Sequence, residues 1–146
     1  IGIESTVIDL TSEIPVLLRP GNVTLDMLES AIGIVELHDG VQEIRSPGMK
    51  YRHYSPDAKV VLADNLEEIA FYSQKYLHKK IGIISRFHPR NDNHYMYKTK
   101  EELAKDIFSI LRSMDKAGVE IIIIQTVDED GIGAAIMNRL NKAAGK

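Results

Sequence analysis

The stretch SPGMKYRHYSP, residues 46–56, carries the residue types best suited to chemistry in this chain. It holds Lys50, Arg52 and His53 with no carboxylate, although the net charge of the whole chain is −3. Its prolines and glycine exclude a regular helix or a central strand. Tyrosine and arginine make buried contacts at low entropic cost, so we expect this segment, which we call the tether, to dock onto something. The residues leave two partners equally open, an anionic ligand and a domain interface.

Two short motifs near the start of the chain also have chemical potential. Glu4–Thr6 places two small hydroxyls side by side on a predicted strand, and hydroxyls can bind a carboxylate or a phosphate. Arg19–Gly21 places an arginine at a predicted strand end, where its guanidinium can fork onto a phosphate. Threonine is also an ordinary strand residue and arginine an ordinary surface residue. The residues alone therefore favour an ordinary structural role for both motifs.

A glycine pair near the end of the chain resembles an anion-binding helix start. Gly131–Gly133 opens the last predicted helix, and amides at a helix N-terminus can cradle an anion. The dinucleotide fingerprint, however, needs a third glycine where Ile136 stands. The acidic run Asp128–Asp130 would also repel a phosphate, so we predict a structural turn. Asn138 and Arg139 follow on this helix, and either bind a ligand or lock the helix to a neighbour.

Composition excludes several classes of site. There is no cysteine, which removes disulfides, thiolate metal sites and cysteine nucleophiles and fits a reducing compartment. The five histidines lack metal-ligand spacing, no serine sits in a nucleophile elbow, and no carboxylate pair is placed for acid–base catalysis. We therefore predict no metal site and no catalytic residue. The longest apolar run, Ile121–Ile124, is too short to span a bilayer, and no signal peptide is evident, so a cytoplasmic location is expected.

Periodicity divides the chain into two parts joined by residues 38–58. Residues 1–37 are predicted to form strand, strand, helix and strand, with an N-cap at Thr24 and a stop at Gly33. This is too little structure to bury a core alone. Residues 59–146 alternate strands with helices, and the predicted strands are 59–62, 80–85, 95–97 and 119–127, with helix caps at Asn65 and Thr99 and a last helix from Gly133. Because their apolar runs do not alternate with polar residues, we predict a small three-layer α/β domain with a Rossmann-like parallel sheet.

The start of the chain suggests a larger protein. Ile1 leads directly into a strand-like pattern with no polar tail before it. We therefore expect the sequence to begin inside a longer polypeptide.

Four segments, taken together and in their order along the chain, resemble the two-domain threonylcarbamoyl-AMP synthases. They are GIESTVIDL, LLRPG, SPGMKYRHYSP and GIGAAIMNRLNKAA. These join a YrdC-type catalytic domain to a C-terminal Sua-type domain. The resemblance implies a reaction of ATP, L-threonine and bicarbonate that gives threonylcarbamoyl-AMP and pyrophosphate for tRNA modification in the cytoplasm. ATP would be a substrate that comes with Mg²⁺, and no tightly bound cofactor is expected. Residues 1–37 would be the remnant of the YrdC-type domain, 38–58 a linker and lid, and 59–146 the Sua-type domain.

The resemblance also implies roles for particular residues. Ser5 would help to hold the threonine and Arg19 the ATP phosphates. Lys50, Arg52 and Tyr54 of the tether would help to seal the cavity and neutralise charge. A lid suits this chemistry because the carbamate and the acyl-adenylate are both open to hydrolysis.

One departure from the family limits what this chain is expected to do alone. Most of the family's nucleotide and threonine site, including a Lys-x-Arg motif, comes from a first part of the YrdC-type domain that this sequence lacks. We therefore expect the chain to be inactive by itself, with the missing part and other tRNA-modification proteins as partners. The alternative is a nucleotide- or partner-binding regulatory module without catalysis. Direct tRNA contact by the tether is weaker because it offers few cations for phosphate.

Overall fold

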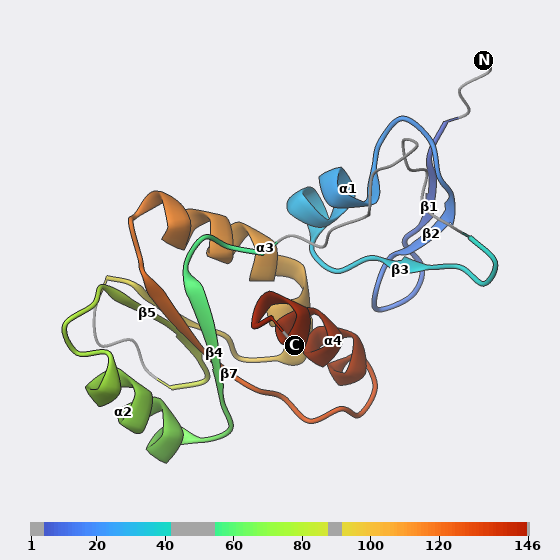
Figure 1. Ribbon diagram of the computed structural model, residues 1–146. Helices are drawn as coiled ribbons and strands as arrows, with labels where there is room; N and C mark the ends of the chain where they lie inside the picture. The colour runs from blue at the N-terminus through green and yellow to red at the C-terminus, as the bar shows by residue number, and fades with distance from the viewer. Residues whose placement is uncertain (1–4, 42–54, 88–91, 146) are drawn as a thin grey trace.

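The computed structural model describes residues 5–41, 55–87 and 92–145, which form a small and a larger unit (Figure 1). The smaller unit contains β1 (Val7–Asp9), β2 (Val16–Arg19), α1 (Leu25–Ile32) and β3 (Glu36–Leu37). β2 is the middle strand, antiparallel to β1 and parallel to β3. The predicted order of strand, strand, helix and strand is therefore confirmed.

The larger unit is built on a four-stranded sheet in the order β4-β7-β5-β6, and every neighbouring pair is parallel. Its elements are β4 (Lys59–Ala63), α2 (Leu66–Lys75), β5 (Ile81–Ser85), β6 (His94–Met96), α3 (Lys100–Lys116), β7 (Ile121–Gln125) and α4 (Gly133–Ala143). The longest apolar run becomes the central strand β7, whose five residues are all buried. The predicted parallel sheet is confirmed.

Helices cover both faces of this sheet. Alternate side chains of β4 and β7, such as Val61 and Ile123, pack with Ile69 of α2 on one face. Their neighbours along the strands, such as Ile122 and Ile124, pack with α3 and α4 on the other. Because successive strand residues point to opposite faces, the uninterrupted apolar run fills both layers. The three-layer arrangement follows from that run.

The helices begin where their capping residues predict. Thr24, Asn65 and Thr99 each accept a hydrogen bond from the backbone amide three residues later. At Thr99 the side chain of Glu102 completes a capping box. None of the helices among the described residues is long and apolar enough to cross a membrane.

The end of α1 joins the two units. Gly33 ends the helix at φ +91°, and a Cβ built there would lie 2.2 Å from the carbonyl oxygen of Ala104 in α3. The next residue, Ile34, donates its backbone N–H to that same carbonyl at 2.9 Å. The side chains of Ile34 and Ile14 belong to the large core cluster of the C-terminal unit. Among the described residues of the smaller unit, just Leu17, Leu25 and Val35 form a buried cluster, which agrees with the prediction that it cannot bury a core alone.

Candidate functional site

The structure brings together the two site residues predicted near the start of the chain. Arg19, at the end of β2, donates its Nε–H to the backbone carbonyl of Ser5 at 3.0 Å. The antiparallel pairing of Val7 with Arg19 produces this contact, and the ladder is irregular between Val7 and Ile8. Both Ser5 and Arg19 are exposed. The guanidinium of Arg19 and the backbone that carries the Ser5 hydroxyl therefore lie together at one exposed end of the β1–β2 pair.

Thr6, the last residue of the Glu4–Thr6 motif, holds the loop that follows Arg19. Its hydroxyl donates to the carbonyl of Val23 at 2.9 Å and accepts from the amide of Val23 at 3.1 Å. Thr6 thus ties the start of β1 to the loop that leads into α1. These hydrogen bonds of Thr6 stabilise the fold, whereas Ser5 is exposed.

The tether is described only where it enters the C-terminal unit. Lys50, Arg52 and Tyr54 lie outside the described residues. Directly after the tether, the amides of Asp57 and Ala58 donate to the carboxylate of Asp115 in α3, at 3.0 and 3.2 Å. The end of the tether is therefore fixed to the larger unit.

Arg139 reaches from α4 into the smaller unit, where it meets a buried carboxylate. Its Nε–H and Nη2–H donate to Glu29 Oε2 at 3.3 and 3.2 Å, and Nη2–H also donates to the carbonyl of Val35 at 3.1 Å. The amide of Val35 donates to the same Glu29 oxygen at 3.0 Å. Asn138 accepts from Nη1–H of Arg139 at 2.8 Å. Of the two roles considered for Arg139, the contacts of the described residues match the lock. We call Glu29, Val35 and Arg139 the latch.

Burial dominates the electrostatics of the latch. The side chain of Glu29 is 3% exposed and that of Arg139 13%. Burial raises the pKa of Glu29 above its ordinary value of 4.5, while the charge of Arg139 and the amide of Val35 oppose the rise. The charge of Asp26, one turn earlier on α1, raises the pKa of Glu29 further. Three donors on one buried oxygen make this a specific contact between the units.

The glycine pair before α4 forms a turn whose polar groups are used internally. The Lys100 ammonium pairs with Asp128 and also donates to the carbonyl of Asp130 at 3.0 Å. Asp128 accepts the amide of Asp130 at 3.2 Å, and its pKa is lowered chiefly by the hydrogen bond from Lys100. A Cβ at Gly133 would lie 1.8 Å from the Asp128 carbonyl. These contacts support the predicted structural turn.

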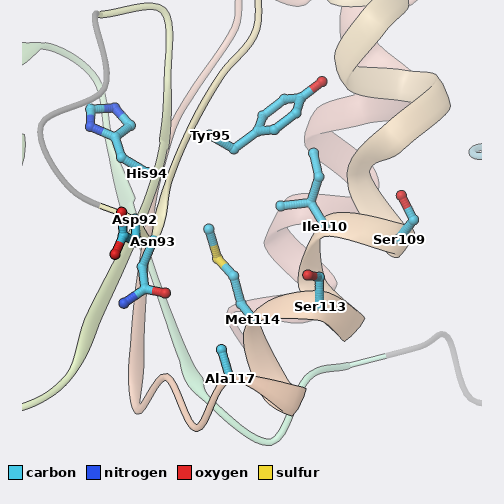
Figure 2. Close-up of a pocket in the computed structure, with 9 residues that line it drawn as sticks. All are labelled: Asp92, Asn93, His94, Tyr95, Ser109, Ile110, Ser113, Met114 and Ala117. Atoms are coloured by element: carbon cyan, nitrogen blue, oxygen red, sulfur yellow. The ribbon is translucent and has the colours of Figure 1, made fainter.

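A cavity of about 420 Å³ opens between the edge strand β6 and α3 (Figure 2). Figure 2 shows Tyr95 and Met114 reaching across the space between the strand and the helix. The lining residues are Asp92, Asn93, His94, Tyr95, Ser109, Ile110, Ser113, Met114 and Ala117. Tyr95 donates its hydroxyl to Asp106 at 3.0 Å, and burial with that carboxylate raises the Tyr95 pKa to about 12.

The sequence did not predict this cavity: the expected strand began at residue 95, and His94 was considered only as a metal ligand. In the structure His94 lies in β6, and its Nε2 is 2.7 Å from the hydroxyl of Ser85. One feature of the sequence could have indicated a polar site on this helix. Ser109 and Ser113 are four residues apart and therefore lie on one helix face. No group of three metal-ligating side chains occurs among the residues that the structure describes.

Comparison with known proteins identifies the family. The model of the threonylcarbamoyl-AMP synthase C-terminal domain matches residues 23–145. The chain belongs to this family, a class of α/β domain with the parallel sheet described above. Threonylcarbamoyl-AMP synthases from Pyrococcus abyssi and Bacillus subtilis are 42% and 35% identical to it over 99% of this chain.

A solved structure supports the same relationship. The crystal structure of P. abyssi Sua5 complexed with L-threonine matches with a TM-score of 0.56 at 41% identity over 99% of this chain. The chain spans about half the length of these relatives, 46% of each.

Proposed function

We propose that the chain forms part of a threonylcarbamoyl-AMP synthase that uses ATP, L-threonine and bicarbonate and that serves tRNA modification. In this reaction the threonine amine and bicarbonate give a carbamate with loss of water. A carbamate oxygen then attacks the α-phosphorus of ATP, and pyrophosphate leaves. The observation that carries the proposal is the contact of Arg19 with the exposed backbone of Ser5, in a chain of this family.

Each of these two residues has a role that suits its chemistry. The Ser5 hydroxyl would hydrogen-bond the threonine, and Arg19 would contact the ATP phosphates. Because Arg19 Nε–H is bonded to the Ser5 carbonyl, the position of the guanidinium depends on the backbone that carries the hydroxyl. The two substrates would thereby be held in a fixed relation, which is how orientation lowers a barrier.

The tether would close the site. Lys50, Arg52 and Tyr54 would cover the bound substrates, exclude water and neutralise the triphosphate. The fixed end of the tether at Asp115 supports this role, because a lid needs an anchored hinge. Magnesium would come with the ATP phosphates, which commonly supply part of its coordination.

The domain limits belong to the same proposal. Residues 1–37 would complete a YrdC-type catalytic domain whose other part lies outside this sequence, 38–58 would be the linker and lid, and 59–146 the Sua-type domain. The chain alone is then expected to lack activity, and its partners are that missing part and other proteins of the modification.

The test is pyrophosphate release from ATP with L-threonine and bicarbonate. We would compare this chain, the longer protein that contains it, and that protein with Arg19→Ala or with Lys50 and Arg52 replaced by serine. An inert chain, an active longer protein and variants slowed at least about tenfold are expected, since lost hydrogen bonds to a charged phosphate cost about 1.5–3 kcal/mol. Turnover by the chain alone would contradict the proposal, and so would a silent longer protein.

The cavity beside α3 favours the second function, a ligand-binding module. Among the residues that the structure describes, its lining includes the carboxylate of Asp92 but no lysine or arginine. A neutral or cationic small molecule therefore suits it better than a nucleotide phosphate. Calorimetric titrations with threonine and with ATP would be run on the chain and on Ser113→Trp, whose larger side chain fills the cavity. Binding that Ser113→Trp abolishes belongs to the cavity, and binding that it leaves unchanged belongs to the first role.

A further inference from the structure

The latch joins the two units at the start of β3, and strand pairing connects that point to the residues of the proposed substrate site. Val35, whose amide and carbonyl both belong to the latch, directly precedes β3 (Glu36–Leu37). The strand β3 pairs with β2, with Glu36 opposite Val16. β2 ends in Arg19, which contacts Ser5. A continuous series of hydrogen-bonded contacts therefore leads from Arg139 of α4, through β3 and β2, to both site residues.

Two further contacts hold the same corner. Gly33 sits against the backbone of α3, and Ile34 donates its amide to Ala104 at 2.9 Å. The chain from Gly33 to Val35 is thus fixed on one side by α3 and on the other by Arg139 of α4 (Figure 1). The backbone contacts set the distance between the units. Among the described contacts at this corner, the latch alone contains a charged pair with directional hydrogen bonds.

We infer that Glu29 and Arg139 are positioning residues, through which the C-terminal α/β domain orients the small sheet bearing Ser5 and Arg19. This inference rests on the proposed function, and it gives the C-terminal domain a part in that reaction without any contact with substrate. The guanidinium is suited to the task because its planar fork fixes direction as well as distance. An apolar pair in the same place would hold the units together but would not fix their angle.

The direct test measures the orientation of the two units. The chain has no cysteine, so Leu10→Cys and Leu77→Cys, at positions 66% and 69% exposed, can each carry one spin label. Distances between the labels would be compared in the labelled chain with and without the double variant E29Q/R139M. The double variant removes both charges together, which avoids leaving an unpaired charge in the buried site. The side-chain carbonyl that E29Q introduces can still accept the amide of Val35.

If the latch orients the units, the distribution of distances between the two spin labels should be narrow in the labelled chain and clearly broader in the double variant. The exposed variant Glu67→Gln is the matched control and should leave the distribution unchanged. An unchanged distribution in the double variant would overturn the inference, whatever the activity of the longer protein. This readout does not depend on catalysis, so it separates a failure of the latch from a failure of the proposed function.

The kinetic test uses the longer protein with the same double variant. Displacement of a reacting group by about 1 Å can cost about a hundredfold in rate, so kcat for pyrophosphate release should fall at least about tenfold, with a smaller change in KM for threonine. The melting temperature would be measured beside it. A lower kcat in a protein that melts normally supports positioning, whereas an unchanged kcat in an active protein overturns it. If the longer protein is silent, the proposed function fails and the distance distribution alone decides the latch.

Discussion

Gly33→Ala should separate the smaller unit from α3. Gly33 has φ +91° and ψ −157°, a region restricted almost entirely to glycine, and an alanine there costs about 1–3 kcal/mol in backbone strain. Its Cβ would also lie 2.2 Å from the Ala104 carbonyl oxygen, so α1 must move away from α3. That movement breaks the hydrogen bond from Ile34 to Ala104, worth about 1 kcal/mol. The total is about 2–4 kcal/mol, a large part of the stability of an ordinary domain.

The matched control is Gly118→Ala. Gly118 also has a positive φ, +78°, but a Cβ there meets nothing within 4 Å. Its alanine variant should therefore cost only the backbone strain of about 1–2 kcal/mol. Urea unfolding followed by far-ultraviolet circular dichroism gives both free energies, and amide exchange at Ile34 reports the contact itself. If Gly33→Ala is no more destabilising than Gly118→Ala and Ile34 stays protected, the close contact of α1 with α3 is refuted.

Two further predictions concern a helix cap and a titrating group. Thr99→Ala removes the N-cap of α3 and its capping box, so urea unfolding should show a loss of about 1 kcal/mol, and a loss near zero would contradict the cap. Because the pKa of Glu29 is raised in the folded protein, by burial first and by Asp26 in addition, its carboxyl group binds the proton more tightly folded than unfolded. The stabilisation from protonation is then present below the ordinary pKa of 4.5 and is lost as pH rises through the higher folded value. The free energy of unfolding should therefore fall with rising pH just above 4.5 more steeply in the parent chain than in Glu29→Gln, and parallel curves for the two would contradict the raised pKa.

Much of the local structure could be predicted because its causes are local. Thr24, Asn65 and Thr99 mark helix starts, since each side chain bonds an amide only three residues away. The run Ile121–Ile124 predicted a strand buried on both faces, since apolar residues without alternation leave no side for water. The sequence motifs also indicated the family that the comparisons identify.

The tertiary structure decided what depends on contacts between distant residues. The sequence could not place β7 between β4 and β5, because strand order depends on which crossovers close over which face of the sheet. Nor could it choose between a ligand and a lock for Arg139, because the partner Glu29 lies 110 residues earlier in the chain. The cavity beside α3 has the same origin, since it exists only where strand β6 and helix α3 come together. Local hydrogen bonds and side-chain periodicity can be read along the chain, but the burial of a charge is decided by the whole fold.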